Sequence, residues 1–439
     1  MKFEKVCVFG LGYIGLPTAS TFATHGLQVV GVDVNPEVVQ TLRNGGLHIQ
    51  EPGLRTLVQA ALRSGNLVIS DQPREADAFI IAVPTPFYDD KKADLRAVSA
   101  AAHAIVPLLR KGNLVVLEST SPPLTTLQVV APILEGSGLR RGEDFHLAYV
   151  PERVLPGQIL RELIENARVI GGIDRASAEA GRDLYSLFVR GEIVLTNATT
   201  AEMVKLMENT YRDVNIAIAN EFARLADRFG VDVWEAIALA NRHPRVNILS
   251  PGPGVGGHCI SVDPWFLVEA APDLARLIRM ARTVNDDQPA YIVELVRRMT
   301  GSLKGLMVTA LGLSYKADVD DLRESPAIEV CRLLQEEGAK VKAFEPHRQG
   351  VSVDGIPLAL SMEEALREAD VLILLVGHSA FKGWSPAEVA SLMPGRLILD
   401  TVNGWDSSAW AAEGFRLVKL GAFSGGMDFN SAKGRREEA

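Results

Sequence analysis

One segment of the chain concentrates residue types that could carry out covalent chemistry. Residues 251–257 are almost all glycine and proline, so we predict a loop with open backbone amides rather than regular structure. Cys259 follows this loop, with His258 beside it and Asp263 four positions later. A thiolate is the reactive form of cysteine, and charged neighbours favour it. Cys259 is therefore a candidate nucleophile, and a buried, inert thiol is the alternative.

The other two cysteines have a different setting. Cys7 lies in an apolar run of strand length and Cys331 on the apolar face of a predicted helix, so we interpret both as core thiols. Three cysteines in 439 residues make no disulfide framework and are typical of a reducing compartment. They contain no C-x-x-C pair, and we expect no metal site.

A second candidate group lies on a predicted helix. Lys205 and Asn209 are four residues apart, a spacing that places them on one face of a helix. On an ordinary surface helix such a pair has no special role. If that face lines a cleft beside a cofactor, the pair could hold a reacting oxygen.

The strongest binding motif is close to the N-terminus. Gly10, Gly12 and Gly15 follow an apolar run directly and precede a predicted helix. The first glycine permits a tight turn, the second lets a pyrophosphate approach the backbone, and the third lets helix and strand pack closely. Asp33 ends the next predicted strand, where a carboxylate binds a ribose 2′-hydroxyl and repels a 2′-phosphate. The pattern predicts NAD rather than NADP as cofactor.

Two further features suit a nucleotide ligand. Thr85 and Thr120 each follow a predicted strand, and ligands bind at the carboxyl ends of strands in open α/β sheets. Arg242, His243 and Arg245 form a local cationic cluster, which suits a diphosphate, although a solvated charged segment is the alternative.

Short apolar strands alternate with helices in the first third of the chain. Residues 6–9, 29–32, 78–83 and 114–117 are apolar runs of strand length, and residues 93–109 have helical spacing. Strands that are apolar on both faces and separated by helices indicate a parallel sheet covered on both sides. The predicted fold class is α/β, doubly wound.

The second half of the chain repeats this order. Residues 26–33, 75–83 and 112–117 are echoed, in sequence, by residues 338–345, 368–376 and 395–400. Three echoes in one order predict two related Rossmann-like domains.

The segment between the two halves has a different composition. Residues 200–240 are almost free of glycine and proline, and their apolar residues recur at helical spacing. We therefore predict one or two long helices with a break at Gly230. Such a helix is a dimerisation element or intramolecular core, and we favour a homodimer or higher homo-oligomer. The predicted parts are a cofactor domain (1–195), a central helical segment (196–295), a second Rossmann-like domain (296–430) and a flexible tail (431–439).

Composition limits the possible partners. Acidic residues outnumber basic ones by 54 to 45, giving a net charge of −9, which disfavours nucleic-acid binding. No apolar run approaches the ~18 residues of a membrane helix, and the N-terminus shows no signal-peptide pattern. We expect a cytosolic protein without membrane insertion.

Taken together, these motifs resemble those of the nucleotide-sugar 6-dehydrogenases, the UDP-glucose/UDP-mannose dehydrogenase family, over essentially the full length. Residues 256–264 resemble the family's nucleophile motif, Lys205 and Asn209 its catalytic helix, and residues 313–316 and 320–326 its second-domain signature. Arg153 stands where glucose-type members usually have phenylalanine, and Pro156 where they have a second acid. Ser261 departs from the proline expected in the cysteine motif.

The resemblance implies a four-electron oxidation. A UDP-sugar, most closely UDP-N-acetyl-D-mannosamine, is oxidised at its C6 alcohol to the uronate by two NAD, and Cys259 forms a thiohemiacetal and then a thioester. UDP-N-acetylglucosamine, its galacto epimer and UDP-glucose are the alternative substrates.

The resemblance also assigns roles to individual residues. Lys205 stabilises the oxyanion or acts as acid and base, and Asn209 binds the developing oxygen. Asp263 orients Lys205 or a water, and Glu152 activates the hydrolytic water. The implied NAD ligands are Gly10, Gly12, Tyr13, Ile14, Gly15, Asp33, Thr85, Thr120 and Arg323. The implied UDP-sugar ligands are Arg153, Val154, Arg212, His243, Arg245, Gly254, Tyr315, Lys316 and Asn403.

Two other readings compete with this one. A two-electron dehydrogenase of the β-hydroxyacid type also joins a Rossmann domain to a helix with a Lys-x-x-x-Asn motif, but it has no need of Cys259 or of a second nucleotide-type domain. A dinucleotide-sensing interaction module explains the glycine motif and leaves the Lys205, Asn209 and Cys259 group without a task.

Overall fold

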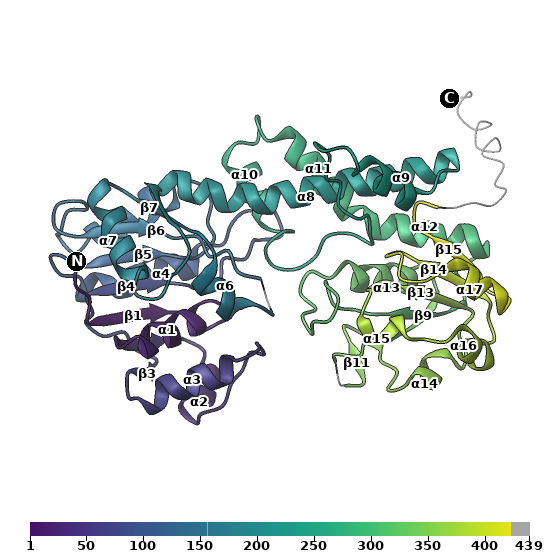
Figure 1. Ribbon diagram of the computed structural model, residues 1–439, viewed down its shortest axis with the longest axis horizontal. Coiled ribbons are helices and arrows are strands. Elements are labelled where there is room, and N and C mark those ends of the chain that lie inside the picture. The colour runs from purple at the N-terminus through teal and green to yellow at the C-terminus, as the bar shows by residue number, and fades with distance from the viewer. Residues whose placement is uncertain (156, 349, 423–439) are drawn as a thin grey trace. The chain divides into compact units, whose positions relative to one another are not determined.

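The computed structural model describes residues 1–155, 157–348 and 350–422 (Figure 1). The chain divides into two compact units. Unit 1 comprises Met1–Asn209 with Trp265–Leu274, and unit 2 comprises Thr210–Pro264 with the described residues of Ala275–Ala439. The predicted tail, residues 431–439, lies outside the described residues, and the predicted domain boundaries at residues 195 and 295 stay predictions.

Unit 1 is built on a sheet of eight strands in the order β3-β2-β1-β4-β5-β6-β7-β8. The strands are β1 (Lys5–Phe9), β2 (Gln28–Val32), β3 (Leu67–Ser70), β4 (Ala78–Ile81), β5 (Leu114–Leu117), β6 (His146–Tyr149), β7 (Arg168–Gly172) and β8 (Ile193–Asn197). All neighbours pair in parallel except β6 and β7, which are antiparallel. The strands that the sequence predicted, which form β1, β2, β4 and β5, pair in parallel as expected, and the antiparallel β6–β7 edge lies in a part of the sheet for which no strand was predicted.

Helices cover both faces of this sheet, because alternate strand residues point to opposite sides. Val6 and Val8 of β1 pack in one core with α1 and α3, while Cys7 and Phe9 pack in another with α4 and α5. The sheet is therefore doubly wound, as predicted. The helices and helical turns are α1 (Gly15–Thr24), α2 (Pro36–Arg43), α3 (Leu54–Arg63), α4 (Arg96–Ile105), η1 (Val106–Leu108), η2 (Thr126–Val130), α5 (Ala131–Glu135), α6 (Ile159–Glu165) and α7 (Arg175–Tyr185).

Unit 2 contains a parallel sheet in the order β10-β9-β13-β14-β15. Its strands, with a separate two-stranded ribbon, are β9 (Met307–Leu311), β10 (Lys340–Phe344), β11 (Ser352–Val353), β12 (Ile356–Pro357), β13 (Val371–Leu374), β14 (Leu397–Asp400) and β15 (Arg416–Lys419). Its helices are α9 (Val233–Ala240), α11 (Arg276–Asp286), α12 (Gln288–Thr300), α13 (Pro326–Glu336), α14 (Met362–Leu366), α15 (Ser379–Lys382), α16 (Pro386–Leu392) and α17 (Ser407–Ala412).

The two sheets confirm the internal repeat. The echoed segments form β2 and β10, β4 and β13, and β5 and β14, which occupy equivalent places in the two strand orders. Even their edge contacts match. Asp77 accepts hydrogen bonds from the amides that begin β1, and Asp370 accepts one from the Met307 amide that begins β9.

Helix α8 (Ala198–Phe229) runs from unit 1 into unit 2, and α10 (Asp263–Ala270) also has residues in both. The predicted break at Gly230 is present, because this glycine has φ +68° and α9 begins three residues later. The C-terminal half of α8 packs on the core of unit 2 through Ala223 and Ala226.

Candidate active site

The glycine turn between β1 and α1 has the geometry of a phosphate cradle. A Cβ on Gly10 would lie 2.5 Å from the Ala82 carbonyl oxygen, and one on Gly15 would lie 1.9 Å from the Gly10 oxygen. Both positions therefore require glycine for packing. At Gly12 a Cβ would meet no atom within 4 Å, so the second glycine borders the open space that a pyrophosphate needs. Tyr13 and Ile14 are half-buried and lead into α1.

Asp33 lies at the end of β2, beside this turn. Its Oδ2 accepts a hydrogen bond from the Leu11 amide at 2.9 Å, and its Oδ1 accepts one from the Asn35 amide at 2.9 Å. The side chain is half-buried, and each carboxylate oxygen can accept a further hydrogen bond. The residues therefore fit a dinucleotide whose ribose hydroxyls donate to Asp33.

The structure also brings the two strand-end threonines together. The Thr85 hydroxyl, after β4, donates to the Thr120 carbonyl oxygen, after β5, at 2.6 Å. Thr85 and Thr120 are both half-buried. Both lie at the carboxyl edge of the sheet, as predicted.

The segment after β6 carries Glu152, Arg153 and Val154. Glu152 is 7% exposed and accepts a hydrogen bond from the Arg153 amide. The Arg153 guanidinium pairs with Glu208 of α8 at 2.6 Å. Glu51, which sequence reasoning missed, accepts hydrogen bonds from the Gly157 and Ile159 amides at 2.8 Å each. A carboxylate distant in sequence therefore fixes this segment at its far end.

Lys205 and Asn209 are buried, at 9% and 7% exposure, so they do not lie on an ordinary surface face of α8. One turn earlier, Glu202 accepts hydrogen bonds from the Leu124 amide and from the amide and hydroxyl of Thr126. Sequence reasoning missed Glu202, although its spacing of three from Lys205 and seven from Asn209 was a signal that all three share a face. Glu202 anchors the helix to the segment that follows Thr120.

The cysteine loop lies in unit 2 and packs closely on the segment after β9. A Cβ on Gly256 would lie 2.4 Å from the Glu324 carbonyl oxygen, and one on Gly257 would lie 2.9 Å from the Tyr315 ring. Burial raises the pKa of Tyr315, and the negative charges of Asp321 and Cys259 raise it further. The loop glycines therefore allow Cys259 to approach the second-domain signature.

Cys259 itself is half-buried, and its carbonyl oxygen accepts the Val262 and Asp263 amides at 3.1 and 2.8 Å. Ser261 donates a hydrogen bond to the Gly257 carbonyl oxygen, so serine ties the loop at the position where we expected proline. Asp263, at the start of α10, is 2% exposed.

The two remaining cysteines are core residues, as predicted. Cys7 and Cys331 are both 0% exposed. Burial raises the pKa of Cys7 to about 11 and that of Cys331 to about 12. Neither thiol ionises at neutral pH, which leaves Cys259 as the cysteine with access to a reactant.

The other predicted substrate and cofactor residues of unit 2 vary in setting. Arg323 pairs with both oxygens of Asp321, its Nη2 lying 2.6 Å from Oδ2. Asn403 has φ +54° and accepts a hydrogen bond from the Lys419 ammonium at 2.6 Å. Lys316 and Gly254 are half-buried, whereas the remaining members of the predicted set are exposed: Arg212, His243 and Arg245.

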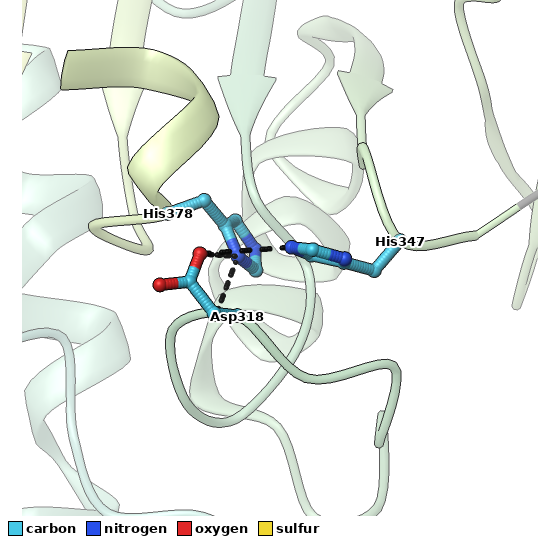
Figure 2. A group of neighbouring side chains, drawn as sticks. All are labelled: Asp318, His347 and His378. Carbon is cyan, nitrogen blue, oxygen red and sulfur yellow. Dashed lines mark hydrogen bonds and ion pairs between the residues drawn. The ribbon is translucent and has the colours of Figure 1, made fainter. Parts of the chain in front are cut away.

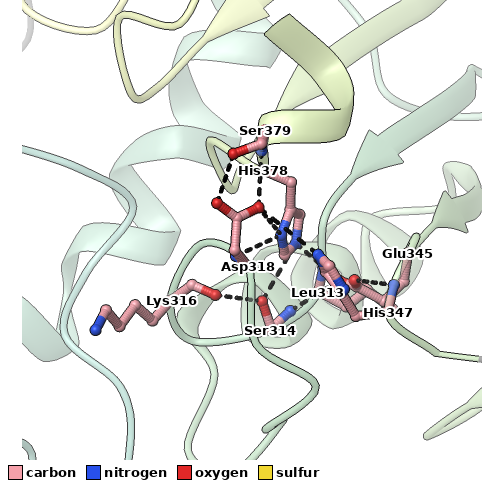
Figure 3. A network of polar contacts seen from close by, with 8 residues as sticks. All are labelled: Leu313, Ser314, Lys316, Asp318, Glu345, His347, His378 and Ser379. Atoms are coloured by element: carbon pink, nitrogen blue, oxygen red, sulfur yellow. Dashed lines mark hydrogen bonds and ion pairs between the residues drawn. The ribbon is translucent and has the colours of Figure 1, made fainter. Parts of the chain in front are cut away.

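The turn of unit 2 that corresponds to the glycine turn is closed (Figure 3). Glu345, at the end of β10, accepts the Leu313 amide at 2.7 Å and the Ser314 amide at 3.1 Å. His378 lies over it, with Nε2 3.2 Å from the Glu345 carboxylate, and both side chains are 0% exposed. Burial alone would raise the pKa of Glu345, but its hydrogen bonds with His378 and the Leu313 amide lower it.

Asp318, His347 and His378 bring three potential metal-ligand atoms within 4.8 Å of one another (Figure 2). The Asp318 amide donates to Nδ1 of His378 at 2.9 Å, so that nitrogen is the acceptor. Nε2 then carries the proton and faces Glu345. Because both nitrogens of His378 are engaged, only two ligands remain, and the cluster is better described as a hydrogen-bonded cap.

Comparisons with known proteins agree with this geometry. Three family models match in order along the chain. They describe the UDP-glucose/GDP-mannose dehydrogenase NAD-binding domain over residues 4–189, the central domain over 199–287 and the UDP-binding domain over 309–407. The family is therefore that of the UDP-glucose and GDP-mannose dehydrogenases. The sequence-based name, which paired UDP-glucose with UDP-mannose, was wrong in the nucleotide of the mannose sugar.

Full-length relatives extend the match. The chain is 48% identical over 427 residues to a UDP-N-acetyl-D-mannosamine dehydrogenase of Methanococcus maripaludis, covering 95% of this chain and 97% of the relative. It is 49% identical over 422 residues to an NDP-N-acetyl-D-galactosaminuronic acid dehydrogenase of Ralstonia solanacearum, covering 94% and 99%. The structure of a UDP-D-ManNAc dehydrogenase from Pyrococcus horikoshii matches with a TM-score of 0.90 at 40% identity, covering 96% and 100%.

The fold and the cradle define a dinucleotide-dependent oxidoreductase with two Rossmann-type domains. The chain belongs to the UDP-glucose/GDP-mannose dehydrogenase family and is an NAD-dependent nucleotide-sugar dehydrogenase with a UDP-binding domain. In the part of the chain that the structure describes, no helix is long and apolar enough to cross a membrane.

Proposed function

We propose that this enzyme oxidises the C6 alcohol of UDP-N-acetyl-D-mannosamine to the uronate with two NAD. The observation that carries the proposal is Cys259, a half-buried thiol in a glycine loop of unit 2, while the other two thiols are buried in cores. The names of the Methanococcus and Pyrococcus relatives support the mannosamine substrate. The Ralstonia relative makes the N-acetylgalactosamine series the main alternative.

The chemistry requires two hydride losses from one carbon. When bound, NAD accepts a hydride at each oxidation. The alcohol first loses a hydride and a proton and becomes the aldehyde. The Cys259 thiolate adds to the aldehyde carbon and the aldehyde oxygen takes up a proton, which gives a thiohemiacetal. The thiohemiacetal then loses that proton and the second hydride and becomes a thioester. Water then attacks the thioester carbon, the C–S bond breaks, and the uronate and the free thiol are released.

The residues of this chain would divide the proton and charge handling. Lys205 would stabilise the oxyanion at C6 and favour the thiolate, and Asn209 would donate to the same oxygen. Asp263 would orient Lys205 or a water, and Glu152 would take the proton of the hydrolytic water.

The binding residues carry over in two groups. Those that would hold NAD are Gly10, Gly12, Tyr13, Ile14, Gly15, Asp33, Thr85, Thr120 and Arg323. Those that would hold the UDP-sugar are Arg153, Val154, Arg212, His243, Arg245, Gly254, Tyr315, Lys316 and Asn403.

A panel of UDP-sugars tests the substrate. Purified enzyme is given NAD with UDP-N-acetyl-D-mannosamine, UDP-N-acetylglucosamine, its galacto epimer or UDP-glucose, and NADH is followed by absorbance. We expect the highest kcat/KM with the mannosamine sugar and two NADH per sugar. A preference for UDP-glucose overturns the substrate, and one NADH per sugar overturns the four-electron reaction.

The variant Cys259→Ser tests the covalent route. We expect uronate formation to be abolished while NAD binding is unchanged, because serine is a far weaker nucleophile for an aldehyde at neutral pH. Cys331→Ser, which changes a buried core thiol, is the matched control for the loss of sulfur. Unimpaired uronate formation by Cys259→Ser would rule out the covalent route.

We further propose that α8 joins two copies of this chain. Ile218, Phe222, Leu225 and Phe229 are 41–70% exposed and spaced four, three and four residues apart, which places them on one stripe of the helix. A second copy related by a twofold axis would cover this stripe with its own. Phe222, Leu225 and Phe229 also border a groove shared with Ile237 and Ile248.

Sedimentation velocity tests this dimer. We expect wild type to sediment as a dimer at micromolar concentration and Phe222→Glu to shift it toward monomer, because a charge cannot be buried unpaired in the stripe. The exposed Arg228 provides the control variant Arg228→Glu, which we expect to remain dimeric. A wild-type monomer would overturn the proposal.

The proposed chemistry also indicates a compartment. Cys259 must remain reduced between turnovers, and the structure shows no disulfide at any of the three cysteines. A reducing compartment such as the cytoplasm satisfies this requirement. Fractionation of the source cells should find the activity with cytoplasmic markers.

A further inference from the structure

A buried arginine lies next to Glu152 in unit 1. Strand β7 runs antiparallel to β6, and Tyr149 pairs with Gly171. Glu152 lies three residues after the end of β6 and Arg168 begins β7, so the antiparallel pairing of the two strands brings these segments to the same end of the pair. Nη2 of Arg168 lies 3.2 Å from Oε2 of Glu152, and the arginine side chain is 5% exposed. The antiparallel edge that sequence analysis did not predict is what places the cation there.

A second carboxylate shares this cation. Glu118 follows β5, is fully buried, and has Oε1 3.9 Å from Nη1 of Arg168. Tyr185 of α7 donates a hydrogen bond to Glu118, and its ring lies 5.0 Å from the Arg168 guanidinium carbon. Among the described residues, Oε2 of Glu118 and Nη1 of Arg168 have no hydrogen-bond partner.

The charges of this group do not balance when both carboxylates are ionised. One guanidinium faces two buried carboxylates, and removal from water disfavours the ionised form of each. Burial, followed by the negative charge of Glu152, raises the pKa of Glu118 to about 7. Near neutral pH Glu118 is therefore partly protonated, while the shorter contact keeps the guanidinium beside Glu152.

We propose that Arg168 is a positioning residue that supplies the counter-charge of the Glu152 carboxylate and orients it for the hydrolytic step, and that Glu118 takes up a proton and so leaves this counter-charge to Glu152. The inference rests on the proposed role of Glu152 as the base. An isolated carboxylate that is 7% exposed would favour its protonated form, which cannot accept a proton from water. Arg168 removes that obstacle without touching the substrate.

The variant Arg168→Met tests the proposal, with UDP-N-acetyl-D-mannosamine and NAD as reactants. A cation within ~4–6 Å lowers the pKa of a carboxyl by about 1–3 units, so we expect the acid limb of kcat against pH to move up by at least about one unit. At pH values on this limb we expect kcat to fall about 10-fold or more, KM for the sugar to stay constant, and the acyl-enzyme thioester to accumulate in intact-protein mass spectra.

Three further variants keep the test decisive if Arg168→Met folds poorly. Arg168→Lys retains the charge and should recover most of the wild-type acid limb. Glu118→Gln keeps an acceptor for Tyr185 and removes the competing charge. The acid limb of its kcat–pH profile should therefore stay in place or move to lower pH. Arg175→Met removes an exposed arginine that pairs with Glu179 on α7 and should match wild type.

The outcomes separate this inference from the proposed function. If Glu152→Gln turns over like wild type, Glu152 is not the base and the proposed function is revised. If Glu152→Gln accumulates the thioester but Arg168→Met and Arg168→Lys both keep the wild-type acid limb, the role of Arg168 alone is overturned. An upward shift of the limb in Glu118→Gln would overturn the charge-sharing half.

Discussion

The two Rossmann-type domains place a carboxylate at the same point and put it to different uses. Asp33 ends β2 and accepts the Leu11 amide of the first turn and the Asn35 amide two residues on. Glu345 ends β10 and accepts the Leu313 amide of the corresponding turn and the His347 amide two residues on. The backbone arrangement is the same in both domains.

The difference lies in what covers each turn. In unit 1 the position after Leu11 is Gly12, which borders open space, and Asp33 is half-buried. In unit 2 the position after Leu313 is Ser314, and the His378 side chain covers the carboxylate completely. A Rossmann fold therefore positions a carboxylate beside a turn, but a dinucleotide site exists only where that turn is left uncovered.

The largest expected effect comes from removing the buried carboxylate of unit 2. Glu345→Ala leaves His378 and three backbone amides without their acceptor, and breaking such a buried polar pair costs about 3–5 kcal/mol. We expect the urea midpoint to fall strongly while the affinity for NAD is unchanged. Tryptophan fluorescence is a suitable probe, because Trp384, Trp405 and Trp410 pack in the second-domain core.

Glu345→Gln is the matched control for this variant. The amide oxygen can still accept from the backbone, so its stability loss should be smaller. A loss of NAD affinity in Glu345→Ala without a loss of stability would break the comparison, because it would mean that the second turn also takes the dinucleotide.

The half-buried carboxylate of unit 1, Asp33, should show the opposite pattern. Asp33→Ala removes a charged acceptor for ribose hydroxyls, and such hydrogen bonds contribute about 1.5–3 kcal/mol, so we expect the Kd for NAD to rise about 10- to 100-fold. The preference for NAD over NADP should also shrink. Titration calorimetry measures both. An unchanged Kd for NAD would contradict the assignment.

A smaller and more selective effect is expected at the second glycine of the cradle. In Gly12→Ala the added Cβ meets no protein atom within 4 Å, so the stability of the free enzyme should not change. The methyl group does occupy the approach of the pyrophosphate, and a steric intrusion of about 1–3 kcal/mol predicts a Kd for NAD about 10-fold higher. A stability loss without a binding loss would show that Gly12 serves packing instead.

The sequence was informative about features that depend on residues close together in the chain. The glycine turn with Asp33, the core setting of Cys7 and Cys331, and the break at Gly230 are all written in short segments, and the structure agrees with each. The internal repeat could also be predicted, because three segments of the first half recur in the same order in the second half.

Other features depend on contacts between distant segments, which no local pattern contains. Glu345 and His378 are 33 residues apart. Glu152 and Arg168 are 16 residues apart, and they lie at the end of β6 and the start of β7, which pair antiparallel. A single apolar run does not encode the direction of its strand. For the same reason the sequence did not predict the hydrogen bonds of Glu51 and Glu202, whose partners lie in loops far away in the chain.

The smallest predicted effect concerns the acid stability of the covered turn. Burial alone would raise the pKa of Glu345, but the hydrogen bonds to His378 and to the backbone amides lower it. A carboxyl with a lowered pKa in the folded state contributes stability that is present above its ordinary pKa of ~4.3 and is lost as the pH falls through the lowered value. Glu345→Gln removes this titration, so the stability difference between wild type and variant should shrink in acid. Urea midpoints at neutral pH and at about pH 3 measure it. If the difference stays constant, hydrogen bonding rather than charge holds the covered turn together.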